Sequence, residues 1–133
     1  MSTDICTSIE QSKKLLSLGI DPSTADMWYS YYGNSKYNPT VAYKGQQWFL
    51  CQIRNSSHDD IPCWSLTALL KLLPDIIKVK EECYTFSLIK NVIEYVGHDG
   101  SILYSTGGES FVDTAVKMFE LIDKDKNILH YVH

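Results

Sequence analysis

The chain has 133 residues, of which 44% are hydrophobic and 21% charged, and its formal net charge is −4 at pH 7. This composition excludes an intrinsically disordered chain, and the length predicts one domain, residues 1–133. The negative charge opposes the neutralisation of phosphates, so we expect no nucleic-acid partner. No apolar run approaches the ~20 residues that span a bilayer, so we expect no membrane partner.

The N-terminus and the cysteines indicate a reducing compartment. Residues 1–6 are polar and acidic, without the basic start and apolar run of a secretory signal. The four cysteines, Cys6, Cys51, Cys63 and Cys83, are irregularly spaced, and a domain of this size is stable without disulfides. We therefore expect free thiols and a cytoplasmic protein.

The first predicted element is a short helix near the N-terminus. Thr7 and Ser8 are typical N-cap residues, and Glu10 or Gln11 stands at the capping-box position three residues later. Gly19 suits the left-handed position that ends a helix.

The middle of the chain predicts extended segments followed by a second helix. Residues 27–43 combine aromatic residues with turn formers and favour short strands or extended loops, and residues 46–53 favour a partly buried strand. Residues 55–60 are polar and predict a solvated loop. Ser65 then caps a leucine-rich helix that Pro74 stops.

The last third of the chain predicts a three-stranded antiparallel meander and a final helix. Residues 84–88, 92–96 and 102–106 indicate strands, and 97–100 is a strong hairpin turn. Apolar positions in 86–96 also fit one face of a helix, but the density of β-branched and aromatic residues favours strands. A helix follows from Ser110, with Phe111, Ala115, Met118 and Ile122 at helical spacing. These elements predict an α+β fold, with about three helices mainly on one face of an antiparallel sheet.

Two segments resemble metal sites, and neither is complete. Residues 123–127 match the start of a calcium loop, but Ile128 stands where the loop needs glycine. Cys51, His58 and Cys63 lack the paired spacing of a zinc site. The sequence therefore predicts no metal and no cofactor.

An excess of aromatic residues between 28 and 49 is the feature that folding alone explains least. Tyrosine and tryptophan are favoured in binding surfaces as well as at core edges, and successive residues of an extended segment point to opposite sides. A small domain that closes its sheet with tyrosines is the other interpretation. The aromatic surface that we predict consists of Trp28, Tyr29, Tyr31, Tyr32, Tyr37 and Tyr43.

The leading hypothesis is a non-enzymatic module that binds another protein through this aromatic surface. One alternative is a homo-oligomer that uses the same surface to associate with itself. Another is a small enzyme whose active site assembles from dispersed acid–base groups. The groups available for such a site are His58, Asp59, Asp60, His98 and Asp99.

Three segments carry a family resemblance. Residues 8–27, 60–70 (with Pro-Cys-Trp-Ser-Leu at 62–66) and 112–118 resemble a family of short uncharacterised proteins of gut Bacteroidetes and their phages or mobile elements. The resemblance covers about half of the chain. It implies a bacterial cytoplasmic or phage-borne protein, and it implies no activity or site residues.

Overall fold

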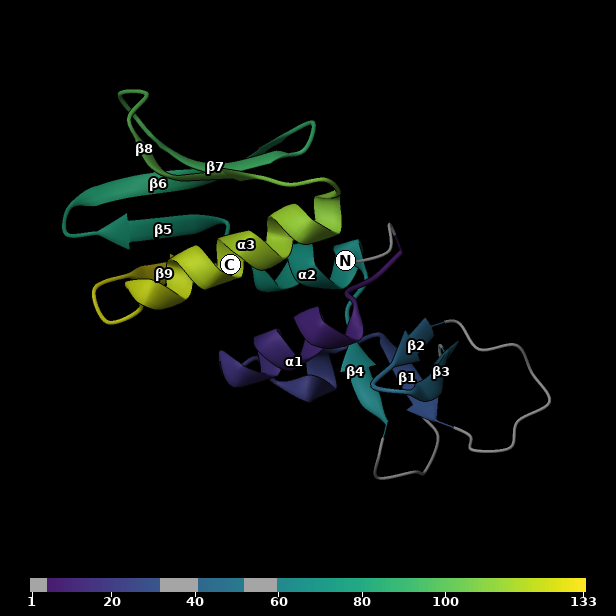
Figure 1. Ribbon diagram of the computed structural model, residues 1–133. Helices are drawn as coiled ribbons and strands as arrows, with labels where there is room; N and C mark the ends of the chain where they lie inside the picture. Colours follow the sequence, from purple (N-terminus) through teal and green to yellow (C-terminus); the bar gives the residue numbers. More distant parts are fainter. Residues whose placement is uncertain (1–4, 32–40, 52–59) are drawn as a thin grey trace.

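The computed structural model describes residues 5–31, 41–51 and 60–133 (Figure 1). Within these ranges the chain forms three α-helices, one short 3-10 helix and nine strands, which confirms the predicted α+β class. The helices are α1 (Ile9–Ser17), the 3-10 helix (Pro22–Thr24), α2 (Leu66–Leu72) and α3 (Phe111–Lys124). The strands are β1 (Met27–Tyr31), β2 (Val41–Tyr43), β3 (Gln46–Cys51), β4 (Ile61–Cys63), β5 (Ile76–Val79), β6 (Glu82–Ile89), β7 (Val92–Gly97), β8 (Ile102–Gly107) and β9 (His130–Val132).

The described strands divide between two antiparallel sheets. One has the order β2-β3-β1-β4 and the other the order β8-β7-β6-β5-β9. The predicted meander is β6, β7 and β8, so residues 84–96 form strands and the helical alternative is wrong. Strands β5 and β9, which the pattern did not predict, extend this meander to five strands, and β4 adds an unpredicted edge to the smaller sheet.

Helix α1 begins and ends as its sequence predicts. Ser8 Oγ accepts a hydrogen bond from Gln11 N at 3.1 Å, and Gln11 Oε1 accepts one from Ser8 N at 2.9 Å, which completes the capping box. Gly19 has a φ of +91°, and Ile20 N then donates to Leu15 O at 3.1 Å. This is the Schellman ending, which glycine adopts without steric cost.

Helices α2 and α3 also begin at the predicted caps. Ser65 Oγ accepts from Ala68 N at 3.2 Å, and Ser110 Oγ accepts from Asp113 N at 3.1 Å. The turn after β7 is closed by Gly100 N, which donates to the carbonyl of residue 97 at 3.0 Å. Local hydrogen bonds therefore account for these boundaries.

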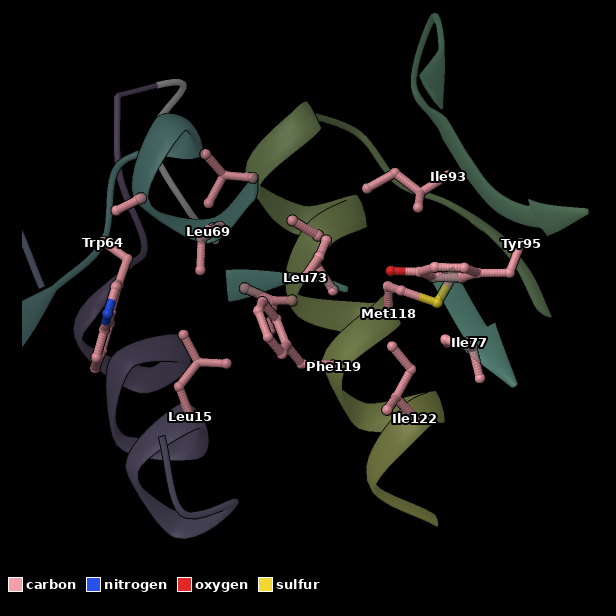
Figure 2. Close-up of a cluster of buried hydrophobic side chains, with 14 of the residues drawn as sticks. Leu15, Trp64, Leu69, Leu73, Ile77, Ile93, Tyr95, Met118, Phe119 and Ile122 are labelled. Carbon is pink, nitrogen blue, oxygen red and sulfur yellow. The ribbon is translucent and has the colours of Figure 1, made fainter. Parts of the chain in front are cut away.

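The main core lies between the larger sheet and the helices. Helix α3 packs against β7 and β8, α2 packs against α3, and both lie on the same side of the sheet (Figure 1). Helix α1 contacts α3 and also β4 of the smaller sheet. Figure 2 shows the buried side chains pointing toward one another from these elements: Leu15, Trp64, Leu69, Leu73, Ile77, Ile93, Tyr95, Met118, Phe119 and Ile122.

A buried polar network around Thr7 joins α1 to the smaller sheet and to the segment between β4 and α2. Thr7 N donates to Trp64 O at 3.0 Å, and Trp64 N donates back to Thr7 Oγ1 at 3.1 Å. The same hydroxyl lies 2.8 Å from Ser12 Oγ in α1, and Tyr29 of β1 donates its hydroxyl to Thr7 O at 2.9 Å. Thr7, Ser12, Tyr29 and Trp64 are all inaccessible to solvent. The network therefore gives these buried polar groups the hydrogen bonds that they cannot make with water.

Replacing Thr7 with valine is expected to lower the free energy of unfolding by about 1–3 kcal/mol, because it leaves Trp64 N and Ser12 Oγ buried without their partner. Thr7→Ser keeps the hydroxyl and is expected to cost less than Thr7→Val. Urea unfolding followed by tryptophan fluorescence measures both values. Equal stability of the two variants would contradict the role assigned to the hydroxyl.

Candidate functional site

Tyr29 is part of the core, so its assignment to the predicted aromatic surface is wrong. Its side chain has no exposed area, and its hydroxyl donates to Thr7 O. Alternation along β1 turns Tyr29 toward α1, where it packs with Cys6, Ile9 and Cys63. Burial, followed by the hydrogen bond with Cys6, raises the pKa of the Tyr29 hydroxyl.

The other described members of the predicted aromatic surface differ in exposure. Tyr31 is 38% exposed, and its ring centre lies 5.6 Å from that of the buried Trp48. Trp48 Nε1 has no hydrogen-bond partner among the described residues. Trp28 is half-buried. Tyr32 and Tyr37 lie outside the described residues.

Tyr43 is half-buried and lies beside two cations. Lys13 Nζ of α1 is 4.7 Å from the centre of the Tyr43 ring, and Lys44 Nζ is 5.5 Å from it. These contacts attach the β2–β3 hairpin to α1 through the ring quadrupole. Part of this ring is therefore engaged within the chain, and Tyr31 is the most exposed of the described aromatic residues in this region.

A surface other than the predicted aromatic surface lies on the side of the five-stranded sheet away from α2 and α3. The strand registers align one residue from each strand in a single row across the sheet. Four of these side chains are apolar, and the fifth is a threonine. From β9 to β8 the row is Val132, Ile76, Thr85, Val96 and Ile102.

Alternation places this row on the uncovered side of the sheet. Ile77 and Tyr95, which neighbour row members in sequence, have no exposed area because they face the helices. Ile102 is 55% exposed and Val132 45% exposed, and no described helix covers them. The apolar side chains at the two ends of the row therefore meet water, whereas Ile76 and Val96 between them are half-buried.

Further residues complete this surface, which we call the open face. Ile89 and Val92 form an apolar pair that is exposed by 64% and 38%, and a shallow hollow bordered by Thr85, Val96 and His98 lies near the centre of the face. By register the open face consists of Ile76, Lys78, Cys83, Thr85, Ser87, Ile89, Val92, Glu94, Val96, Ile102, Ser105, His130 and Val132.

The sequence analysis missed the open face because β5 and β9 were not predicted. One signal was present, since β7 carries Val92 and Val96 on one side and Ile93 and Tyr95 on the other. A strand that is apolar on both sides is typical of burial on both sides. Here only one side is covered by described residues.

The acid–base groups of the enzyme hypothesis do not converge in the described part of the chain. His98 and Asp99 lie in an exposed turn, where hydrogen bonds from Ser101 hold the pKa of Asp99 below its usual range. Asp60 is half-buried, and His58 and Asp59 lie outside the described residues. Among described residues the only ion pair joins Lys126 and Asp123 at 3.3 Å.

An apolar cavity of about 240 Å³ lies where the ends of α1, α2 and α3 meet β9. The polar side chains that line it include the Lys126–Asp123 ion pair and His133, whose Nε2 lies 3.1 Å from Leu72 O. The cavity is smaller than most small-molecule sites, and these polar groups are already engaged. It therefore gives less support for a function than the open face.

The described residues contain neither a metal-binding cluster nor a membrane-spanning helix. No group of three or more histidine, cysteine or acidic residues within 5–31, 41–51 and 60–133 is arranged to hold a metal ion. Over the same ranges, every helix is too short or too polar to cross a bilayer. Comparisons with protein-family models, with curated proteins and with solved structures find no match.

We expect Tyr29→Phe to make unfolding less sensitive to alkaline pH. The raised pKa keeps Tyr29 neutral in the folded state, whereas in the unfolded chain it ionises near pH 10. The contribution of neutral Tyr29 to the free energy of unfolding is therefore complete below about pH 10. Above that pH it falls by about 1.4 kcal/mol per pH unit.

Urea midpoints between pH 8 and 11 test this expectation, with Tyr31→Phe as the control because Tyr31 is exposed. An equal alkaline slope in wild type and Tyr29→Phe would show that the buried hydroxyl is not responsible.

Thiol reactivity is expected to separate the open face from the core. Cys83 is exposed, so a chromogenic disulfide reagent should modify it rapidly in the folded protein. Cys6 and Cys63 are buried, and the hydrogen bond with Cys6, together with burial, raises the pKa of the Cys63 thiol. They should react only in denaturant. Cys83→Ser should remove the fast phase and leave at most the slower reaction of the half-buried Cys51, so a fast phase that survives in the Cys83→Ser, Cys51→Ser double variant would be incompatible with the fold.

Proposed function

We propose that this protein is a non-enzymatic interaction module whose protein-binding surface is the open face. The observation that carries the proposal is the apolar row across all five strands, with Ile102 and Val132 half exposed. Monomeric proteins rarely leave a contiguous apolar surface of this kind without a partner. The proposal keeps the predicted class of function and moves the binding surface away from the aromatic region.

The composition of the open face supports protein binding rather than catalysis. Its centre is apolar, and polar and charged side chains lie around it, notably Lys78, Glu94 and Ser105. An apolar centre with a polar margin is the usual anatomy of a protein–protein interface. The acid–base groups of the enzyme hypothesis that the structure describes, Asp60, His98 and Asp99, are not gathered around this face, apart from His98 at the border of its shallow hollow.

The most exposed apolar residues of the open face have little to contribute to folding, which also favours a role in binding. Ile102 and Ile89 retain more than half of their accessible surface in the folded chain. Substitutions at such positions usually change the free energy of unfolding by no more than about 0.5 kcal/mol. Their apolar character is therefore better explained by a partner than by stability.

Site-specific photo-crosslinking in the cells that naturally make the protein tests this proposal. A photoreactive phenylalanine at Ile102 should give one discrete adduct, because this side chain is at the exposed end of the row. The control carries the same group at Lys71, which is exposed. Lys71 belongs to α2, and α2 lies on the other side of the five-stranded sheet from the open face.

The adduct from Ile102 should disappear when Val96→Asp is added, since a carboxylate in the centre of the row opposes burial. Failure to form an adduct at Ile102, or identical adducts from Ile102 and Lys71, would refute the proposal.

A further inference from the structure

We propose that the open face binds a second copy of this chain, and that a two-fold axis passing close to Thr85 relates the two copies. This inference rests on the proposed function, because it names the partner of the same surface. Three observations carry it: the placement of two opposite charges, the absence of ion-pair partners for them within the described chain, and the size of the face.

Lys78 and Glu94 lie at equivalent positions on opposite sides of Thr85. Lys78 is on the neighbouring strand β5 and pairs with Cys83, two residues before Thr85. Glu94 is on the other neighbouring strand, β7, and pairs with Ser87, two residues after Thr85. A spacing of two residues keeps all of these side chains on one side of the sheet.

This placement is self-complementary. A two-fold axis that lies between two stacked open faces, near Thr85, brings Lys78 of each copy over Glu94 of the other. Two pairs of opposite charge then form at once, as the reciprocal contacts of a two-fold interface require.

Neither charge has an ion-pair partner in its own chain among the residues that the structure describes. Lys78 is exposed and Glu94 half-buried, so the two side chains are available at the surface. The charges of Lys78 and Glu94 cancel each other. The remaining titratable nitrogen of the open face is that of His130, on the edge strand β9. The open face therefore avoids the repulsion that a net charge of −4 per chain would otherwise cause.

The size of the open face fits a weak dimer. Strands about 4.8 Å apart and rows about 6.7 Å apart give a footprint on the order of 20 Å by 20 Å, or roughly 600 Å² per copy once side-chain margins are included. The total of roughly 1,200 Å² lies at the lower end of specific interfaces. Because area alone does not set affinity, the concentration series below covers both weak and tight association.

Light scattering of the purified full chain, from about 5 to 500 μM, tests the inference. The wild type should approach twice its mass of 15.2 kDa as concentration rises. Lys78→Glu places two carboxylates opposite each other and Glu94→Lys two ammonium groups, so each should weaken association by roughly tenfold or more. The double variant restores opposite charges and should associate within roughly threefold of wild type.

Lys71→Glu is the matched control, because it makes the same charge change on α2, away from the open face, and should leave association unchanged. Circular dichroism establishes that each variant folds. Ile102→Lys, which alters the apolar row instead of the charges, should abolish association and keeps the inference testable if a charge variant does not fold.

The outcomes separate this inference from the proposed function. A wild type that stays monomeric up to the highest concentration, while Ile102 crosslinks to a different protein, would overturn the second copy as partner and leave the interaction module intact. A monomer with no crosslink would overturn both. Association that Lys78→Glu and Glu94→Lys weaken no more than Lys71→Glu does would overturn the two-fold arrangement.

Discussion

The attachment of α1 and the smaller sheet to the main core depends on the buried hydrogen bonds around Thr7. Thr7 and Trp64 exchange two hydrogen bonds, and the adjoining contacts with Ser12 and Tyr29 reach α1 and β1. Trp64 lies in the main core, whereas its neighbour Cys63 lies in the core of the smaller sheet. Buried polar groups of this kind tolerate few alternative geometries, because each orphaned group costs its full desolvation penalty. The network therefore fixes where the first helix and the smaller sheet attach.

The positions of the helices leave one side of the larger sheet without a covering helix among the described residues. Helix α1 lies between the two sheets, contributing Ile9 to one core and Leu15 to the other. Helices α2 and α3 share one side of the five-stranded sheet, and no described helix remains to cover the other side. An antiparallel sheet tolerates one solvated face, but such a face is normally polar. The apolar row through Val96 and Ile102 departs from that pattern, and the partner proposed above would account for the departure.

The aromatic residues between 28 and 49 and the residues of the open face have different roles. In the aromatic region, Tyr29 and Trp48 serve the smaller core, and Tyr43 is held beside Lys13 and Lys44. The Tyr29 hydroxyl is bonded within the chain, and the Tyr43 ring contacts two lysines of the same chain, as is common for tyrosine at the edge of a small core. On the open face the apolar side chains have no such internal role.

A bacterial or phage origin remains an expectation from the sequence resemblance.

The sequence determined the local elements, because caps, turns and periodicity act over a few residues. The helix caps Ser8, Ser65 and Ser110, the turn at 97–100 and the meander all follow from such short-range signals. Strands β4, β5 and β9 are only three or four residues long, too short for a period to register, and their pairing comes from distant segments. Only the tertiary structure decided which side of each strand faces a helix. The burial of Tyr29 and the exposure of the open face therefore emerged from packing, since a strand pattern specifies two sides but not what covers them.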